Sequence, residues 1–318
     1  MSLVEIKDLT VRYKVSGGFL SAVDNVSLSI GEGLTFGLVG ESGCGKTTLG
    51  LSILRILPSN AVIERGEIRI NGSDILKLND YKFREMRGKY ISMVFQGAMN
   101  SLNPVINIGK QVAETLVVHE KMRESEALNL ARQKLKIVGL PESVVKMFPH
   151  ELSGGMKQRV VIAMALMDNP RVLIADEPTT ALDVVTQIGI LKLLKSLSKE
   201  YGLTTVFISH DLALVSEVAD EVGIMYGGKM CETGKKKDVL TNPYHPYTNA
   251  LLSSIITTRT EKEITGIPGD IISLINPPYG CRFYDRCPSR RESCKNYDYK
   301  SMVVEKDHAV YCDLYGSG

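Results

Sequence analysis

The feature that most constrains the fold of this sequence is a glycine-rich stretch at residues 40–47, which follows the short apolar run 34–39. The stretch reads GESGCGKT and fits the pattern Gly-x4-Gly-Lys-Ser/Thr. Its glycines allow the backbone to turn several N–H groups inward, and the start of a following helix strengthens the anion site that they form. We expect Lys46 to reach the β- and γ-phosphates and Thr47 to ligate Mg²⁺. The pattern predicts a strand, a loop that binds a nucleoside triphosphate, and a helix over 46–57.

A second apolar run, residues 172–175, ends in two adjacent acids, Asp176 and Glu177. The run is as apolar as a strand buried on both faces of a parallel sheet, and such a strand would place both carboxylates near the phosphate loop. Asp176 then suits Mg²⁺ binding, and Glu177 suits activation of the water that attacks the γ-phosphate. The sequence therefore predicts hydrolysis as well as binding.

A third motif, Ser153 with Gly154 and Gly155, precedes the helical run 160–167. Ser153 is placed to cap that helix, and the backbone amides beside it form another anion seat. Spacing alone does not separate a plain helix cap from a ligand-binding role.

Together, six elements in this order resemble the ATP-binding subunits of ABC transporters, over residues 3–254. The resemblance implies Glu177, His210 and Gln96 as catalytic residues, and Thr47, Gln96 and Asp176 as magnesium ligands. The nucleotide contacts that it implies are Tyr13, Gly40, Glu41, Ser42, Gly43, Cys44, Gly45, Lys46, Thr47, Thr48, Ser153, Gly154, Gly155 and Asp183.

The resemblance also gives these residues separate roles. Gln96 would link Mg²⁺ and the attacking water to the membrane subunits, while residues 153–155 would close over the ATP of a second subunit. Residues 181–183 would contact that subunit, and His210 would sense the γ-phosphate. Tyr13 would stack on adenine, although a tyrosine at the end of an alternating strand is also simply a strand residue. A satisfied core histidine is the alternative for His210.

The chain has 318 residues, of which 44% are hydrophobic, and this is enough for a sizeable core. Its 38 basic and 36 acidic residues leave a net charge of +2, so we expect no nucleic acid partner. The basic run 235–237 is interpreted as a solvated turn. The apolar runs are too short to cross a bilayer, and the N-terminus lacks a signal-peptide layout. We expect a protein at the cytoplasmic face of the cell membrane, attached through its partners.

The pattern along the chain predicts an α/β fold. It comprises the parallel-sheet core of a P-loop NTPase, an antiparallel β subdomain with strands near 3–13 and 22–30, and a helical subdomain that carries the signature motif. We place the ATPase domain at 1–256, with the helical subdomain at about 98–168, and a small cysteine-rich extension at 257–318.

The extension holds four of the six cysteines, Cys281, Cys287, Cys294 and Cys312. A reducing compartment disfavours disulfides, so these four thiols indicate a metal site, with four ordinary buried cysteines as the alternative. Zinc and an iron–sulfur cluster both accept four thiolates, and the spacing leaves the choice between them open. Cys44 and Cys231 are interpreted as packing residues.

Residues 277–283 and 286–288, with the run His-Pro-Tyr-Thr at 245–248, resemble the C-terminal extension of oligopeptide/dipeptide importer ATPases. That resemblance implies a [4Fe-4S] cluster on the four cysteines, with zinc as the alternative. The arginines of this region would suit an anionic cluster: Arg282, Arg286, Arg290 and Arg291.

The function implied is an ATP-hydrolysing subunit of an ABC importer for di- and oligopeptides. Its partners would be a second ATP-binding subunit, two transmembrane permease subunits and, indirectly, an extracytoplasmic solute-binding protein. An importer of oligosaccharides or nickel is the alternative cargo class. A soluble ABC-type ATPase acting on DNA or ribosomes is a further alternative, which the single cassette and the near-neutral charge disfavour.

Overall fold

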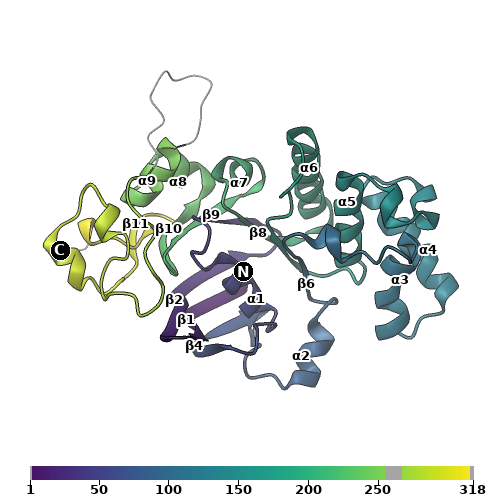
Figure 1. Ribbon diagram of the computed structural model, residues 1–318, viewed down its shortest axis with the longest axis horizontal. Coiled ribbons are helices and arrows are strands. Elements are labelled where there is room, and N and C mark those ends of the chain that lie inside the picture. Colours follow the sequence, from purple (N-terminus) through teal and green to yellow (C-terminus); the bar gives the residue numbers. More distant parts are fainter. Residues whose placement is uncertain (1, 255–266, 316–318) are drawn as a thin grey trace. The chain divides into compact units, whose positions relative to one another are not determined.

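The computed structural model describes residues 2–254 and 267–315, and the chain divides into two compact units. The first unit contains Met1–Lys77 and Phe207–Gly318, and the second contains Leu78–Val206. The strand β8 (Thr204–Ser209) crosses the boundary between them. Figure 1 labels elements of both units where there is room. The domain boundary expected at residues 256 and 257 lies outside the described residues.

An antiparallel sheet forms one part of the first unit, in the strand order β2-β1-β4-β5 (Figure 1). Its strands are β1 (Ser2–Val15), β2 (Gly18–Gly31), β4 (Ala61–Ile70) and β5 (Ser73–Asp74). Val4 and Ile6 of β1 are buried, at the alternate positions that one face of a strand requires. The predicted antiparallel pairing of 3–13 with 22–30 is confirmed.

A second group of strands in the first unit places the glycine-rich loop. The strand β3 (Thr35–Val39) is buried throughout and runs parallel to β9 (Glu221–Tyr226). The strand β10 (Lys229–Lys235) pairs antiparallel with β9. The chain then returns in β11 (Met302–Glu305) and β12 (His308–Val310), and β12 pairs antiparallel with β10. The C-terminal residues therefore extend the sheet of the first unit.

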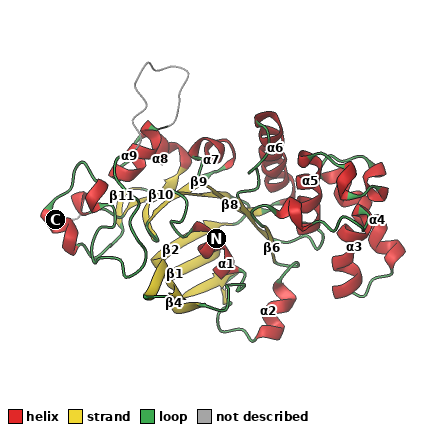
Figure 2. Ribbon diagram, in the orientation of Figure 1, coloured by secondary structure: helices red, strands yellow, loops and turns green. Residues whose placement is uncertain are grey.

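The helices of the first unit, shown in Figure 2, are α1 (Lys46–Ile53), α7 (Leu212–Val218), α8 (Lys236–Thr241) and α9 (Pro246–Ser253). Short 3-10 turns occupy Tyr284–Arg286, Glu292–Asn296 and Asp313–Tyr315. A Cβ on Gly37 of β3 would lie 2.1 Å from Val215 Cγ1, so glycine is required where α7 packs on that strand.

Two local expectations are wrong. The helix α1 ends at Ile53 rather than residue 57, and Arg55 adopts a left-handed φ of 49°. The basic run 235–237 is not a solvated turn, because β10 ends at Lys235 and α8 begins at Lys236. Lys236 Nζ donates to the carbonyl of Ser216 at 2.7 Å, so this side chain fixes the start of α8.

The second unit combines a parallel strand pair with a group of helices (Figure 2). The strands β6 (Ile91–Val94) and β7 (Val172–Asp176) pair in parallel, and all their residues are buried. The helices are α2 (Asp80–Met86), α3 (Ile108–His119), α4 (Glu124–Ile137), α5 (Gly154–Ala165) and α6 (Val184–Tyr201). Three 3-10 turns occupy Ala98–Ser101, Glu142–Lys146 and Pro149–Glu151.

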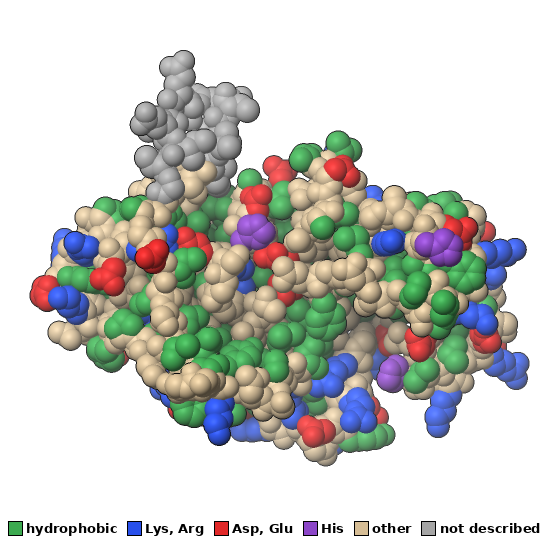
Figure 3. Space-filling view, viewed as in Figure 1, with side chains coloured by type: hydrophobic (Ala, Val, Ile, Leu, Met, Phe, Trp, Pro, Cys, Tyr) green, Lys and Arg blue, Asp and Glu red, His purple; other side chains and the backbone are tan. Residues whose placement is uncertain are grey.

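Helical periodicity explains the packing of α4. Its buried residues Ala127, Ala131 and Leu135 recur every four positions and therefore form one apolar face, and the charged residues of the helix lie outside that face. No helix within the described ranges is long and apolar enough to cross a membrane. Basic and acidic side chains are both distributed over the face drawn in Figure 3, as expected for a net charge near zero.

Candidate nucleotide site

The glycine-rich loop of the first unit lies between β3 and α1, and its shape requires glycine. Gly43 and Gly45 adopt left-handed φ values of 79° and 102°. A Cβ on Gly45 would lie 1.9 Å from the carbonyl oxygen of Ala22, and one on Gly40 would lie 2.0 Å from that of Met225. Any side chain at either position would displace the neighbouring backbone.

The side chain of Lys46 folds over this loop and bonds to its backbone. Its side chain is buried, with 5% of the residue exposed, and Nζ donates to the carbonyls of Gly40 at 2.7 Å and Glu41 at 3.0 Å. Within the described part of the chain, no side chain caps the N-terminus of α1, and its first turn holds no acidic residue. A cation and the first amides of a helix therefore share one loop, which is an arrangement that favours a bound phosphate.

The first unit also contains Tyr13, Thr47, Thr48 and His210. The hydroxyl of Tyr13, a half-buried residue of β1, lies 3.0 Å from Thr48 Oγ1, so the ring is held beside the first turn of α1. Thr47 is exposed. His210 is exposed directly after β8, so it is not the buried core histidine of the alternative interpretation.

In the second unit the ends of β6 and β7 bring two polar side chains together. Val94 pairs with Ala175, and Gln96 Nε2 then donates to Glu177 Oε2 at 3.0 Å. Thr180 Oγ1 donates to the same oxygen at 3.1 Å. The adjacent Asp176, the last residue of β7, is only 1% exposed.

The backbone of Glu177 is strained. Its φ is 44°, in the left-handed region, and such a conformation costs a residue other than glycine about 1–3 kcal/mol. Strain of this kind accumulates at functional sites, where the surrounding structure holds a side chain in place.

Residues 153–155 and Asp183 are also neighbours within the second unit. Ser153 caps α5, because its Oγ accepts the N–H of Met156 at 3.3 Å. A Cβ on Gly155 would lie 2.5 Å from Thr186 Cγ2 in α6. Asp183 caps α6 by accepting the N–H of Thr186 at 2.9 Å and its hydroxyl at 2.6 Å, and these hydrogen bonds lower the pKa of Asp183.

The surface beside this cap is apolar. Val184, Val185 and Ile188 of α6 are exposed, Val185 by 81%, and Ser153 and Gly154 are exposed as well. Exposed aliphatic side chains that lie together in this way are typical of a surface that binds another protein.

Sequence reasoning missed three residues that contact the predicted site. Thr180 was overlooked although it lies close to the acids in sequence. Tyr247 and Arg286 both contact Glu41 of the glycine-rich loop. In the sequence, Tyr247 stands out as part of the His-Pro-Tyr run and Arg286 as the arginine before Cys287. Nothing in the sequence indicates that these two side chains reach the glycine-rich loop.

The four C-terminal cysteines are partly buried, and burial raises the pKa of Cys281 to about 11 and that of Cys312 to about 12. The charges of the other three thiols raise the pKa of Cys312 further, so the four lie within electrostatic range. Across residues 2–254 and 267–315, however, no three His, Cys, Asp or Glu side chains form a group that could hold a metal ion. The structure does not support the predicted cluster or its zinc alternative.

Three of the four arginines expected beside the cluster have other partners. Arg282 pairs with Asp24 of β2, Arg286 pairs with Glu41, and Arg290 lies over the ring of Tyr284. Cys44 and Cys231 are both buried, as expected for packing residues.

The fold and the glycine-rich loop define an ATP-binding cassette of the ABC class. A family model described as ABC transporter matches residues 23–180, and one described as oligopeptide/dipeptide transporter, C-terminal region, matches residues 231–294. Among solved structures, the dimeric cassette MJ0796 bound to ADP and phosphate is 32% identical with a TM-score of 0.65, over 73% of this chain and 98% of that chain. The cassette cbiO1 from Clostridium perfringens is 30% identical with a TM-score of 0.66, over 76% and 91%.

Two curated relatives indicate which kind of ABC transporter subunit this chain resembles. The oligopeptide transport ATP-binding protein OppD of Bacillus subtilis is 46% identical over 286 residues, which are 88% of this chain and 80% of that protein. The dipeptide transport ATP-binding protein DppD of the same organism is 42% identical over 317 residues, 98% of this chain and 94% of that protein. The chain belongs to the family of ATP-binding subunits of oligopeptide/dipeptide ABC importers.

Proposed function

We propose that this chain hydrolyses ATP to drive the import of short peptides. The observation that supports it best is the glycine-rich loop of the first unit, where Lys46 and the open N-terminus of α1 form a site for phosphate. Lys46 would exchange the carbonyls of Gly40 and Glu41 for phosphate oxygens. Tyr13 would contact the base beside Thr48, and His210 would sense the γ-phosphate.

The reaction would use the acids of the second unit. Glu177 would accept a proton from water as the water oxygen bonds to the γ-phosphorus, and the bond from that phosphorus to the β–γ bridging oxygen would break to release ADP. Gln96, which is hydrogen-bonded to Glu177, would orient the carboxylate and the water. Thr47, Gln96 and Asp176 would hold Mg²⁺, which offsets the charge of the phosphates.

A second ATP-binding subunit would complete the site. Ser153 and Gly154 are exposed beside the apolar start of α6, so they are available to the ATP of a partner, and Asp183 lies next to them. The dimeric state of MJ0796 supports this arrangement. Two transmembrane permease subunits would hold the pair at the cytoplasmic face of the membrane, and a solute-binding protein would deliver the peptide.

The decisive experiment replaces Glu177 by Gln in the assembled importer. Loss of the base is expected to reduce ATP turnover by about 100-fold or more while nucleotide binding is retained. Glu200→Gln, at an exposed position of α6, is the matched control and is expected to leave turnover unchanged. If Glu177→Gln hydrolysed ATP at the normal rate, Glu177 would not be the base.

For the C-terminal cysteines we propose a [4Fe-4S] cluster with a structural role. Support comes from the resemblance of residues 277–283 and 286–288 to the C-terminal extension of the importer ATPases, and not from the arrangement of the four cysteines, which among the described residues form no group able to hold a metal ion. Anaerobically purified protein is expected to be brown and to contain about four irons, all lost in Cys287→Ser but not in Cys231→Ser. Colourless protein with one zinc would contradict the cluster.

A further inference from the structure

We infer that the C-terminal half of the first unit positions the phosphate loop, through two contacts that Tyr247 and Arg286 make with Glu41. The inference rests on the proposed ATP site and names positioning residues for it. Tyr247 belongs to the His-Pro-Tyr run, and Arg286 directly precedes Cys287. Both lie more than 200 positions from the loop, at separations of 206 and 245 residues.

The contact with Arg286 is a bidentate ion pair. Its Nη1 lies 2.7 Å from Glu41 Oε2, and its Nη2 lies 3.0 Å from Oε1. Arg286 is only 8% exposed, and its remaining hydrogen bonds go to the Tyr226 hydroxyl at 3.3 Å and to two backbone carbonyls of residues 267 and 268. Every nitrogen of the guanidinium therefore has a partner, and the orientation of the group is fixed.

The backbone of Glu41 joins this ion pair to the phosphate-binding lysine. The N–H of Glu41 donates to the Tyr247 hydroxyl at 3.0 Å. Its carbonyl accepts from Lys46 Nζ at 3.0 Å. A shift of Glu41 would therefore move the loop backbone from which Lys46 must turn to reach the phosphates.

A buried aromatic cluster fixes the groups that hold Glu41. The rings of Tyr226, Tyr247 and Phe283 pack together, with centroid distances of 4.7, 5.2 and 5.3 Å. The N–H of Tyr247 donates to His245 Nδ1 at 3.0 Å, and buried Glu232 of β10 accepts the N–H of His245 at 3.0 Å. The His-Pro-Tyr run is thus tied to the sheet, and Tyr247 has little freedom to follow a displaced loop.

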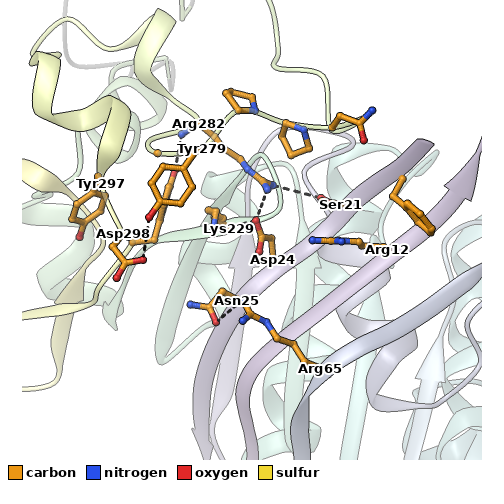
Figure 4. Close-up of a pocket in the computed structure, with 16 residues that line it drawn as sticks. Arg12, Ser21, Asp24, Asn25, Arg65, Lys229, Tyr279, Arg282, Tyr297 and Asp298 are labelled. Atoms are coloured by element: carbon orange, nitrogen blue, oxygen red, sulfur yellow. Dashed lines mark hydrogen bonds and ion pairs between the residues drawn. The ribbon is translucent and has the colours of Figure 1, made fainter. Parts of the chain in front are cut away.

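A second buried arginine, Arg282, anchors the same segment to β2. Figure 4 shows its side chain extending to Asp24 and the carbonyl of Ser21, and all three residues line a cavity of about 410 Å³. The same Nη1 that contacts the Ser21 carbonyl also donates to the carbonyl of Gly227. Because Arg282 and Arg286 are both held, the segment that presents Arg286 to the loop cannot move freely.

The ion pair between Arg286 and Glu41 also affects nucleotide binding through its charge, in addition to fixing the position of the loop. The Glu41 carboxylate is carried by a loop that must accept polyanionic phosphate, and an unpaired carboxylate there would repel the nucleotide. Arg286 neutralises it. Loss of Arg286 would therefore weaken nucleotide binding both by freeing the loop and by exposing this negative charge.

The test compares Arg286→Ala with Arg291→Gln in the assembled importer, measuring MgADP affinity and the KM and kcat of ATP hydrolysis. A freed loop and an unpaired carboxylate both oppose binding, so we expect Arg286→Ala to weaken MgADP binding and raise KM by about 10- to 100-fold, with kcat changing far less. Arg291 is exposed in the same segment, and its variant is expected to match the wild type. Arg286→Lys is expected to recover part of the affinity, because an ammonium keeps the charge without the bidentate geometry.

A double-mutant cycle isolates the pair. Glu41→Gln in the Arg286→Ala background is expected to bind MgADP better than Arg286→Ala alone, since it removes the unpaired charge. Should Arg286→Ala fail to fold, Tyr247→Phe removes only the hydroxyl that holds the Glu41 amide, and a several-fold weaker affinity is expected.

Equal MgADP affinity for the wild type and a folded Arg286→Ala variant would overturn the inference, as would equal affinity for Tyr247→Phe if only that variant folds. Such a result would leave the proposed ATPase intact, provided that the wild type binds MgADP and Glu177→Gln loses turnover. Failure of the wild type itself to bind nucleotide would instead refute the proposed function.

Discussion

Replacement of Gly155 by alanine is expected to destabilise the second unit by a mechanism that one further substitution can reverse. The added Cβ would lie 2.5 Å from Thr186 Cγ2, which is 0.9 Å less than the 3.4 Å at which ordinary contacts begin. Thr186 cannot simply rotate, because its hydroxyl and N–H both bond to Asp183, the residue that caps α6.

The magnitude follows from two opposing effects. Overpacking costs about 1–3 kcal/mol. Alanine regains at most about 0.5–1 kcal/mol over glycine in a helix. The net loss is centred near 1 kcal/mol and reaches about 2.5 kcal/mol at most, and each kcal/mol lowers the Tm by roughly 2–4 °C for a folding unit of about 150–250 residues.

Thermal unfolding of three variants tests this reasoning. Thr186→Ser in the Gly155→Ala background removes the clashing methyl and keeps the hydroxyl, so it is expected to restore most of the lost stability. Thr186→Val in the same background keeps a methyl and loses the hydroxyl, so it is expected to give no recovery. If Thr186→Ser left the Tm of Gly155→Ala unchanged or lowered it, the steric explanation would be refuted.

Two further predictions concern the first unit. Burial lowers the pKa of His245 to about 3, so the unfolded chain binds a proton that the folded chain does not between pH 6.5 and 3. The contribution of neutral His245 to the free energy of unfolding is therefore complete above pH 6.5. It is lost as the pH falls towards 3, by up to about 1.4 kcal/mol per pH unit. His245→Asn, which retains a helix cap, is expected to flatten this part of the stability profile in denaturant titrations, and an unaltered slope would contradict the assignment. Tyr13→Phe loses only the hydroxyl near Thr48 and is expected to bind MgATP almost as well as the wild type. Tyr13→Ala loses the ring and is expected to bind MgATP about 10-fold more weakly. If calorimetry gave Tyr13→Ala and the wild type equal affinities for MgATP, Tyr13 would not contact the base.

The parts of the site that the sequence predicted depend on local patterns. The apolar run before Gly40 and the glycine spacing indicate a strand, a loop and a helix, because each requirement lies within a few residues. The meeting of Gln96 with Glu177 follows from parallel strands that end at one edge of a sheet. Ser153 was predicted as a cap for a similar reason, since a cap bonds to the turn that it precedes, whereas the capping role of Asp183 was not predicted.

The parts that the sequence did not predict depend on tertiary contacts. Arg286 was expected beside a metal cluster because Cys287 follows it, yet its guanidinium pairs with Glu41. Similarly, the His-Pro-Tyr run indicated a family but not that Tyr247 would bond to the loop. Helix α1 ends early because the chain turns at Arg55 into a left-handed conformation, and no glycine marks that position.

The pairing of β12 with β10 has a consequence for any shortened form of the chain. In the full chain the backbone groups along part of β10 are satisfied by a neighbour that arrives from the last twenty residues. Removal of those residues would leave β10 as an open edge with unpaired amides and carbonyls, which invites strands of other molecules to add on. Aggregation of a truncated cassette would then result from the exposed edge of β10, and it would not indicate a defect in ATP hydrolysis.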